Sequence, residues 1–107
     1  MTVRPILKLG NPHLYEIADP VERAELSSLV PVIKDLHDTL MDFRDRMGAG
    51  RAIAAPQIGV QKRLVYMFVT EPVVFINPRL ENLSKARITL WDDCMSFPDL
   101  LVRVQRH

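Results

Sequence analysis

One segment, Gly48-Ala49-Gly50-Arg51-Ala52-Ile53-Ala54-Ala55-Pro56-Gln57-Ile58-Gly59, divides the 107-residue chain into a helical part and a strand-rich part. Its glycines and alanines carry little or no side chain, so they leave space for a second backbone to approach closely. Gln57 adds a carboxamide that can make specific hydrogen bonds. The segment therefore indicates a loop that binds another chain or a ligand.

The residues before this segment predict one amphipathic helix. It is expected to begin at Ser27 or Ser28, where a serine side chain would cap the first turn, and to tolerate Pro31 near its start. Spacings of three and four residues give one apolar stripe, formed by Ile33, Leu36, Leu40, Phe43 and Met47. Gly48 and Gly50 are expected to end the helix.

The residues after the segment predict short strands. Runs rich in β-branched and aromatic residues cover 64–69 and 73–76, and further strands are expected at 86–91 and 100–104. Before the helix, residues 6–19 are expected to run irregularly over the surface, because Gly10-Asn11-Pro12 is typical of a turn. A helix followed by strands, without a repeat or linker, predicts one α+β domain over residues 1–107.

The composition is that of a globular protein without a strong charge. Apolar residues make up 48% of the chain and charged residues 25%, and the formal net charge is +1. This charge gives no overall attraction to nucleic acid or to an anionic membrane, so neither partner is expected. No apolar run has the length of a signal peptide or a membrane span, and a cytoplasmic location is expected.

The single cysteine, Cys94, lies in the turn-forming run Trp91-Asp92-Asp93-Cys94-Met95-Ser96-Phe97-Pro98. One cysteine cannot form an internal disulfide. Cys94 is therefore a buried apolar filler, a reactive thiol or a metal ligand. Trp91 is expected to pack near this turn.

The two segments, in this order, resemble the first two motifs of the peptide deformylase family, G-x-G-L-A-A-x-Q and E-G-C-L-S. The match is close at Ala54-Ala55-Pro56-Gln57-Ile58-Gly59, and Cys94-Met95-Ser96 follows it. The resemblance covers nearly the whole chain but only the N-terminal portion of a typical family member. It implies an incomplete peptide-deformylase-like fold, with the N-terminal helix packed on short, mainly antiparallel strands.

The resemblance also implies a role for each matched residue. Cys94 would be a thiolate ligand of a divalent metal, commonly ferrous iron, with zinc, nickel or cobalt as alternatives. Gln57 and the backbone N–H of Met95 would stabilise the oxyanion that forms when a formyl amide is hydrolysed. The residues that would pair with the extended backbone of the substrate are Gly50, Arg51, Ala52 and Ile53.

Several positions depart from the family pattern. Ala52 stands where the second glycine is usual and restricts the backbone there. Arg51 replaces an aliphatic residue, Met95 replaces leucine, and Asp92-Asp93 replaces Glu-Gly. None of these changes alone excludes the activity, because the backbone donor at Met95 is kept.

The third family motif, H-E-x-x-H, is absent from the chain, whose histidines are His13, His37 and His107. The chain therefore lacks the two histidine ligands and the glutamate general base that the resemblance implies, and His107 is a poor substitute for them. We expect the N-terminal portion of a peptide deformylase, truncated at its C-terminal side and inactive alone. The family removes the formyl group from the N-formyl-methionyl ends of nascent polypeptides.

The family helix that carries the third motif covers the sheet. Without it, strand residues such as Val65, Met67, Val74 and Ile76 are expected to face solvent. The expected partners are N-formylated nascent peptides, the ribosome, and either a complementing C-terminal segment or a second copy. The alternative from another class is a non-catalytic remnant that binds an extended peptide or a partner protein through the uncovered sheet and the glycine loop. A fragment without independent function is the third hypothesis.

Overall fold

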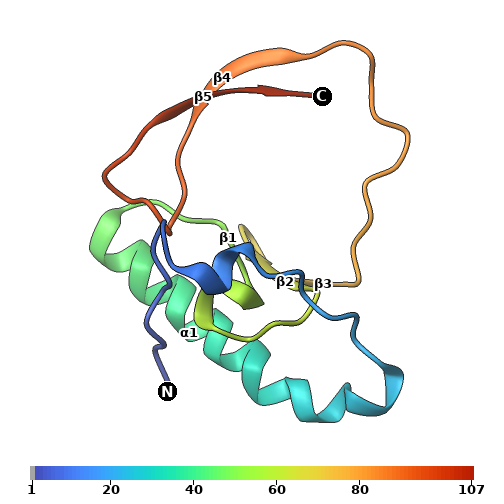
Figure 1. The fold of residues 1–107 in the computed structure, drawn as a ribbon. Coiled ribbons are helices and arrows are strands. Elements are labelled where there is room, and N and C mark those ends of the chain that lie inside the picture. The colour runs from blue at the N-terminus through green and yellow to red at the C-terminus, as the bar shows by residue number, and fades with distance from the viewer. Residues whose placement is uncertain (1) are drawn as a thin grey trace.

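The computed structural model of the chain describes residues 2–107 and shows an α+β fold, as predicted (Figure 1). A long helix packs on a three-stranded sheet, and a two-stranded hairpin stands apart from both. The helix and strands are α1 (Val30–Met47), β1 (Ala52–Ala54), β2 (Leu64–Phe68), β3 (Pro72–Ile76), β4 (Ile88–Asp92) and β5 (Val102–Arg106). The 3-10 helices are η1 (Pro12–Tyr15), η2 (Arg23–Glu25), η3 (Ser27–Leu29) and η4 (Ala55–Ile58).

Helix α1 ends where predicted but begins later. Its N-cap is Leu29, which has no capping side chain, and Ser28 instead donates its hydroxyl to the Glu25 carbonyl at 2.6 Å. The predicted serine cap is therefore wrong, because the serines lie in η3, a tighter turn that leads into the helix. At the other end, Gly48 is left-handed and its N–H donates to the Arg44 carbonyl. Within residues 2–107, no helix is long and apolar enough to cross a bilayer.

The three-stranded sheet is antiparallel, in the order β1-β2-β3. β2 and β3 correspond to the strands predicted at 64–69 and 73–76, with Tyr66 opposite Val74. β1 pairs with the other side of β2, with Ile53 opposite Tyr66. It was not predicted, because two alanines around one isoleucine carry little strand propensity. β1 is an edge strand of this sheet.

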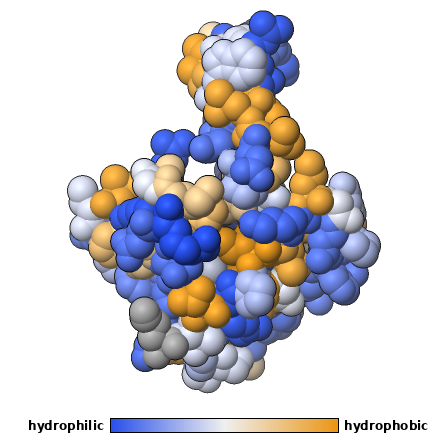
Figure 2. All heavy atoms as spheres, turned by 90° about the vertical axis from the view of Figure 1, so that its left-hand side faces the viewer, coloured by the Kyte–Doolittle hydropathy of each residue, from blue (hydrophilic) through white to orange (hydrophobic). Residues whose placement is uncertain are grey.

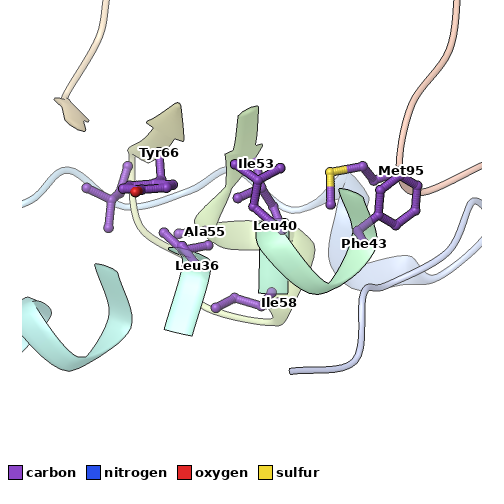
Figure 3. Close-up of a cluster of buried hydrophobic side chains, with 9 residues drawn as sticks. Leu36, Leu40, Phe43, Ile53, Ala55, Ile58, Tyr66 and Met95 are labelled. Atoms are coloured by element: carbon purple, nitrogen blue, oxygen red, sulfur yellow. The ribbon is translucent and has the colours of Figure 1, made fainter. Parts of the chain in front are cut away.

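The core lies between α1 and the sheet (Figure 3). Its buried members are Leu36, Leu40, Phe43, Ile53, Ala55, Ile58, Leu64, Tyr66 and Met95. Full burial of a large apolar side chain stabilises the fold by about 1.5–3 kcal/mol. The predicted helix stripe is confirmed at its centre, but Met47 is 47% exposed because it lies in the last turn of α1, beside an open cleft. Met95 attaches the cysteine turn to this core.

The β4–β5 hairpin projects from the body of the protein (Figure 2). Its strands lie one or two residues beyond the ranges predicted for them. Trp91 pairs with Arg103 on one face of the hairpin and is 62% exposed, so the prediction that it packs near the cysteine turn is wrong. The opposite face carries Ile88, Leu90, Val102 and Val104, together with Asp92 and Arg106, whose side chains form an ion pair at 3.3 Å.

Apolar side chains are also exposed on the sheet. Val74 and Ile76 of β3 are 37% and 42% exposed, as expected for strands without a cover. Val65 and Met67 of β2 are half-buried, so solvent reaches them less than predicted. The exposed part of the sheet is therefore its β3 side.

Candidate functional site

A cleft of about 450 Å³ opens between the end of α1, the segment before β1 and the cysteine turn. Of the residues that the sequence predicted for the site, the cleft is lined by Gly50, Arg51, Ala52, Gln57, Cys94 and Met95. The sequence did not predict the other lining residues, which are Phe43, Met47, Ala49, Asp92, Asp93 and Pro98. Ile53 is the one predicted site residue outside the cleft, since it is 1% exposed and packs in the core.

The carboxamide of Gln57 has a fixed orientation. Its Oε1 accepts a hydrogen bond from the Ala54 N–H at 2.9 Å, which turns Nε2 toward the cysteine turn. Nε2 then donates to Ser96 Oγ at 3.0 Å and to Cys94 Sγ at 3.6 Å. Gln57 and Cys94 are 37 residues apart in sequence, and the fold brings their side chains into contact.

The cysteine turn holds its sulfur at the cleft wall. The Phe97 N–H donates to the Cys94 carbonyl at 3.0 Å, which closes the predicted turn. The Ser96 N–H points back to Cys94 Sγ at 3.5 Å. Cys94 is half-buried and free. The sulfur therefore accepts two N–H groups while part of the residue remains open to the cleft.

Met95 contributes to both the core and the cleft. The side chain is 6% exposed and packs in the core, whereas the residue also lines the cleft. Among residues 2–107, no acceptor pairs with the Met95 N–H. A backbone donor is thus left free beside Gln57 and Cys94.

The outer side of β1 offers backbone groups to an incoming strand. The Arg51 carbonyl accepts from the Phe68 N–H at 2.8 Å, so Arg51 directs its backbone groups toward β2. Neighbouring residues of a strand direct these groups to opposite sides. Ala52 therefore presents its N–H and carbonyl to the free edge. Ile53 directs its backbone groups to β2 again, and its side chain packs in the core.

Arg44 of α1 fastens the loop beside this edge. Its Nε donates to the Gly50 carbonyl at 2.9 Å, another guanidinium N–H donates to the Phe68 carbonyl, and the guanidinium lies 5.6 Å from the Phe68 ring centre. Sequence reasoning missed this residue, because both acceptors are backbone carbonyls, which every residue has.

A second polar contact lies outside the cleft. His37 Nδ1 and Tyr66 Oη are 2.6 Å apart. Burial raises the pKa of Tyr66, and the nearby charge of Arg44 partly opposes that increase. Neither ring lines the cleft, so we assign them a structural role.

The described residues do not complete a metal site. Within residues 2–107, no group of three or more His, Cys, Asp or Glu side chains could hold an ion. His107 follows β5 at the end of the hairpin where Ile88 pairs with Arg106, and its Nδ1 contacts the Ser84 carbonyl at 2.6 Å. Cys94 follows the opposite end of β4. His107 is therefore not brought to the sulfur.

Comparison with known proteins now identifies the family. The sequence profile described as polypeptide deformylase matches residues 3–107. The chain belongs to the polypeptide deformylase family. Peptide deformylase 2 of Ralstonia nicotianae is 38% identical over 116 residues, and peptide deformylase of Rhizobium meliloti is 34% identical over 112 residues. The K1U-bound crystal structure of class I type b peptide deformylase from Acinetobacter baumannii superposes with a TM-score of 0.86 at 32% identity.

The matches extend over almost all of this chain but over only part of the relatives. The alignments cover 98% and 99% of the chain but 63% and 61% of the Ralstonia and Rhizobium deformylases. The Acinetobacter structure is covered to 71%, against 99% of this chain. The fold predicted by the resemblance, a helix on antiparallel strands in a peptide-deformylase-like arrangement, is confirmed.

Sequence reasoning assigned no role to Ser96, although it stands in the Cys-Met-Ser motif of this deformylase family member. The structure gives it two contacts with the site: its Oγ accepts from Gln57 and its N–H approaches Cys94. The signal that could have found it is its position two residues after the cysteine, from which its N–H can reach back to the sulfur.

Proposed function

We propose that this chain supplies the substrate-binding and oxyanion-stabilising part of a peptide deformylase, which removes the formyl group from N-formyl-methionyl ends of nascent polypeptides. The observation that supports it most is the 3.6 Å contact between Gln57 Nε2 and Cys94 Sγ in the cleft wall. Met95, whose N–H has no acceptor among residues 2–107, lines the same cleft as Gln57 and Cys94. Such nascent chains are made in the cytoplasm, which is the location that this function implies.

The substrate backbone is proposed to lie along β1. Ala52 would exchange backbone hydrogen bonds with it, which gives affinity without reading the substrate's side chains. The side chains of Phe43 and Met47 line the cleft and provide an apolar surface for the substrate's methionine.

Two donors are proposed to stabilise the negative charge that develops on the formyl oxygen. Gln57 Nε2 carries two N–H groups. The one that contacts Cys94 Sγ makes the longer contact, so we assign it to the oxyanion, and the other keeps its hydrogen bond to Ser96 Oγ. The Met95 N–H is the second donor. Removal of one donor of this kind typically costs about 2.7–4 kcal/mol of transition-state stabilisation.

Cys94 is proposed as the one metal ligand within the chain. Its Sγ lies at the cleft wall, 3.6 Å from Gln57 Nε2 and 3.5 Å from the Ser96 backbone nitrogen, and cysteine sulfur is a common ligand of divalent metals. When bound, a divalent metal acts as a Lewis acid and activates water. Ferrous iron is our first choice, with zinc, nickel or cobalt as alternatives.

The remaining groups are proposed to come from a complementing segment that carries His-Glu-x-x-His. Its two imidazoles would join Cys94, and its glutamate would move the proton to the leaving amine. Residues 1–107 alone are then expected to be inactive.

The test is to mix the purified chain with a separately produced segment that carries the His-Glu-x-x-His helix, under anaerobic conditions with ferrous ion. Release of formate from formyl-Met-Ala-Ser is expected only when both parts are present. Cys94→Ala should abolish turnover, and Cys94→Ser is the matched control for side-chain volume. Full activity of the alanine variant would refute the ligand role.

The free β1 edge also favours a second candidate, a module that binds extended peptides without catalysis. Peptide binding that needs no metal, together with no turnover after complementation, would support this candidate. A chain that binds neither peptide nor segment would support the hypothesis of no independent function.

A further inference from the structure

The N-terminal arm, residues 2–9, contacts both halves of the cleft wall. The Leu7 N–H donates to the Gln57 carbonyl at 2.8 Å, and the Leu9 N–H donates to the Ser96 carbonyl at 2.8 Å. Figure 1 shows the arm passing α1 and reaching the base of the β4–β5 hairpin. Within residues 2–107, no other segment makes backbone hydrogen bonds to both η4 and the cysteine turn.

The two donors are two residues apart, directly before a turn in which the Asn11 N–H donates to the Lys8 carbonyl at 3.0 Å. N–H groups two residues apart in an extended segment point to the same side and lie about 6.7 Å apart. The N–H of Lys8, between them, has no acceptor among residues 2–107, as expected if it points away. The arm therefore fixes the separation of the Gln57 and Ser96 backbones.

The start of the arm is anchored to α1. The Arg4 N–H donates to Thr39 Oγ1 at 2.9 Å, and Thr39 is 1% exposed. The Arg4 guanidinium pairs with Asp35 at 2.9 Å, and the Thr2 N–H donates to Asp38 at 3.0 Å. Because Thr39 is buried in the helix that also builds the core, its hydroxyl ties the arm to a rigid element.

We propose that the arm sets the position of Gln57 relative to Cys94, with Leu7, Leu9 and Thr39 as positioning residues. The side chain of Gln57 contacts the cysteine turn through Nε2, which lies 3.0 Å from Ser96 Oγ and 3.6 Å from Cys94 Sγ. The arm supplies the backbone connection that keeps these contacts in register. The consequence for catalysis rests on the proposed function, whereas the positioning itself does not.

The test uses proline variants of the whole chain. Leu7→Pro and Leu9→Pro each remove one N–H donor, and Lys8→Pro is the matched control because its N–H is not used. The Gln57 side-chain amide is followed by ¹H–¹⁵N NMR, and Cys94, the only cysteine, by its alkylation rate with iodoacetamide at fixed pH. Loss of one hydrogen bond is expected to raise the alkylation rate about 2- to 10-fold and to shift the Gln57 resonances. Lys8→Pro should change neither.

A second pair of variants covers the case in which a proline prevents folding. Thr39→Val keeps the side-chain volume but removes the acceptor for the arm, and Thr39→Ser restores it. Thr39→Val should reproduce the changes at Gln57 and Cys94, and Thr39→Ser should resemble the wild type. If Thr39→Val lowers thermal stability but leaves the Gln57 resonances and the alkylation rate unchanged, the arm is only a structural support and the proposal is wrong.

In the complemented enzyme, the same variants should lower kcat by up to about 100-fold with little change in KM, since misplacement by about 1 Å can have this effect. NMR changes without any turnover in the wild type would keep the positioning role and refute the deformylase function. Wild-type kcat in all variants would overturn the catalytic consequence.

Discussion

Replacement of Gly50 by alanine tests whether packing as well as backbone conformation holds the loop beside the cleft. Gly50 has a φ of +124°, and an added Cβ would lie 3.3 Å from Phe43 Cδ1 and 3.5 Å from Leu40 Cδ1. The backbone conformation costs a residue with a side chain about 1–3 kcal/mol. Phe43 and Leu40 are buried and have little room to move, so crowding adds about 1–3 kcal/mol. We expect Gly50→Ala to lower the free energy of unfolding by about 2–6 kcal/mol.

Gly48→Ala is the matched control. Gly48 also has a positive φ, +71°, but no heavy atom lies within 4 Å of the Cβ position. This substitution should cost only the conformational part, about 1–2 kcal/mol. Both variants are measured by urea denaturation followed by circular dichroism, with wild-type m values as the check on two-state behaviour. Equal destabilisation of the two variants would show that the Phe43 contact does not restrict the loop, and the reasoning would be wrong.

Three further substitutions test single contacts. Gln57→Glu keeps the oxygen that accepts from the backbone but loses the donor, so kcat of the complemented protein should fall about 10²–10³-fold with little change in the urea midpoint; wild-type kcat would exclude the oxyanion role. Arg44→Met keeps the aliphatic side chain but loses both carbonyl contacts, and should lower the free energy of unfolding by about 1.5–3 kcal/mol, with an unchanged urea midpoint as the contrary result. Asn77 Oδ1 accepts from the Val21 N–H at 2.8 Å and its Nδ2 donates to the Val21 carbonyl at 3.0 Å. Asn77→Ala should therefore cost about 1–3 kcal/mol in thermal unfolding, and Asn77→Asp, which keeps the acceptor, should cost less.

Local patterns predicted the elements whose stability is local. Gly48 ends α1 because a glycine can adopt the left-handed conformation there, and this is visible in the sequence. The apolar stripe predicted the buried face of α1 because its three- and four-residue spacing is also visible in the sequence. β1 was missed because Ile53 becomes a strand residue only through its pairing with Tyr66 in β2. The exposure of Trp91 was missed because it depends on how the hairpin stands relative to the body.

In the candidate site, too, the sequence indicated some of the residues and not others. The resemblance indicated Gln57 and Cys94, and the structure brings them together across 37 residues of sequence. Nothing in the sequence indicated the contacts of Arg44, or those of Leu7 and Leu9 in the arm, because their partners are backbone carbonyls. A motif names side chains, whereas the backbone groups that position them have no sequence signal.

A helix across the cleft would serve both the packing and the chemistry of the proposed site. Two histidines in His-x-x-x-His spacing lie on one face of a helix, so a helix that presents both to Cys94 must lie across the cleft. A helix placed there would approach Met47, which is 47% exposed and lines the cleft. The same segment that completes the ligands would therefore also bury apolar surface at Met47. Metal binding and burial are then linked, because a metal that binds only the assembled site stabilises the assembled state.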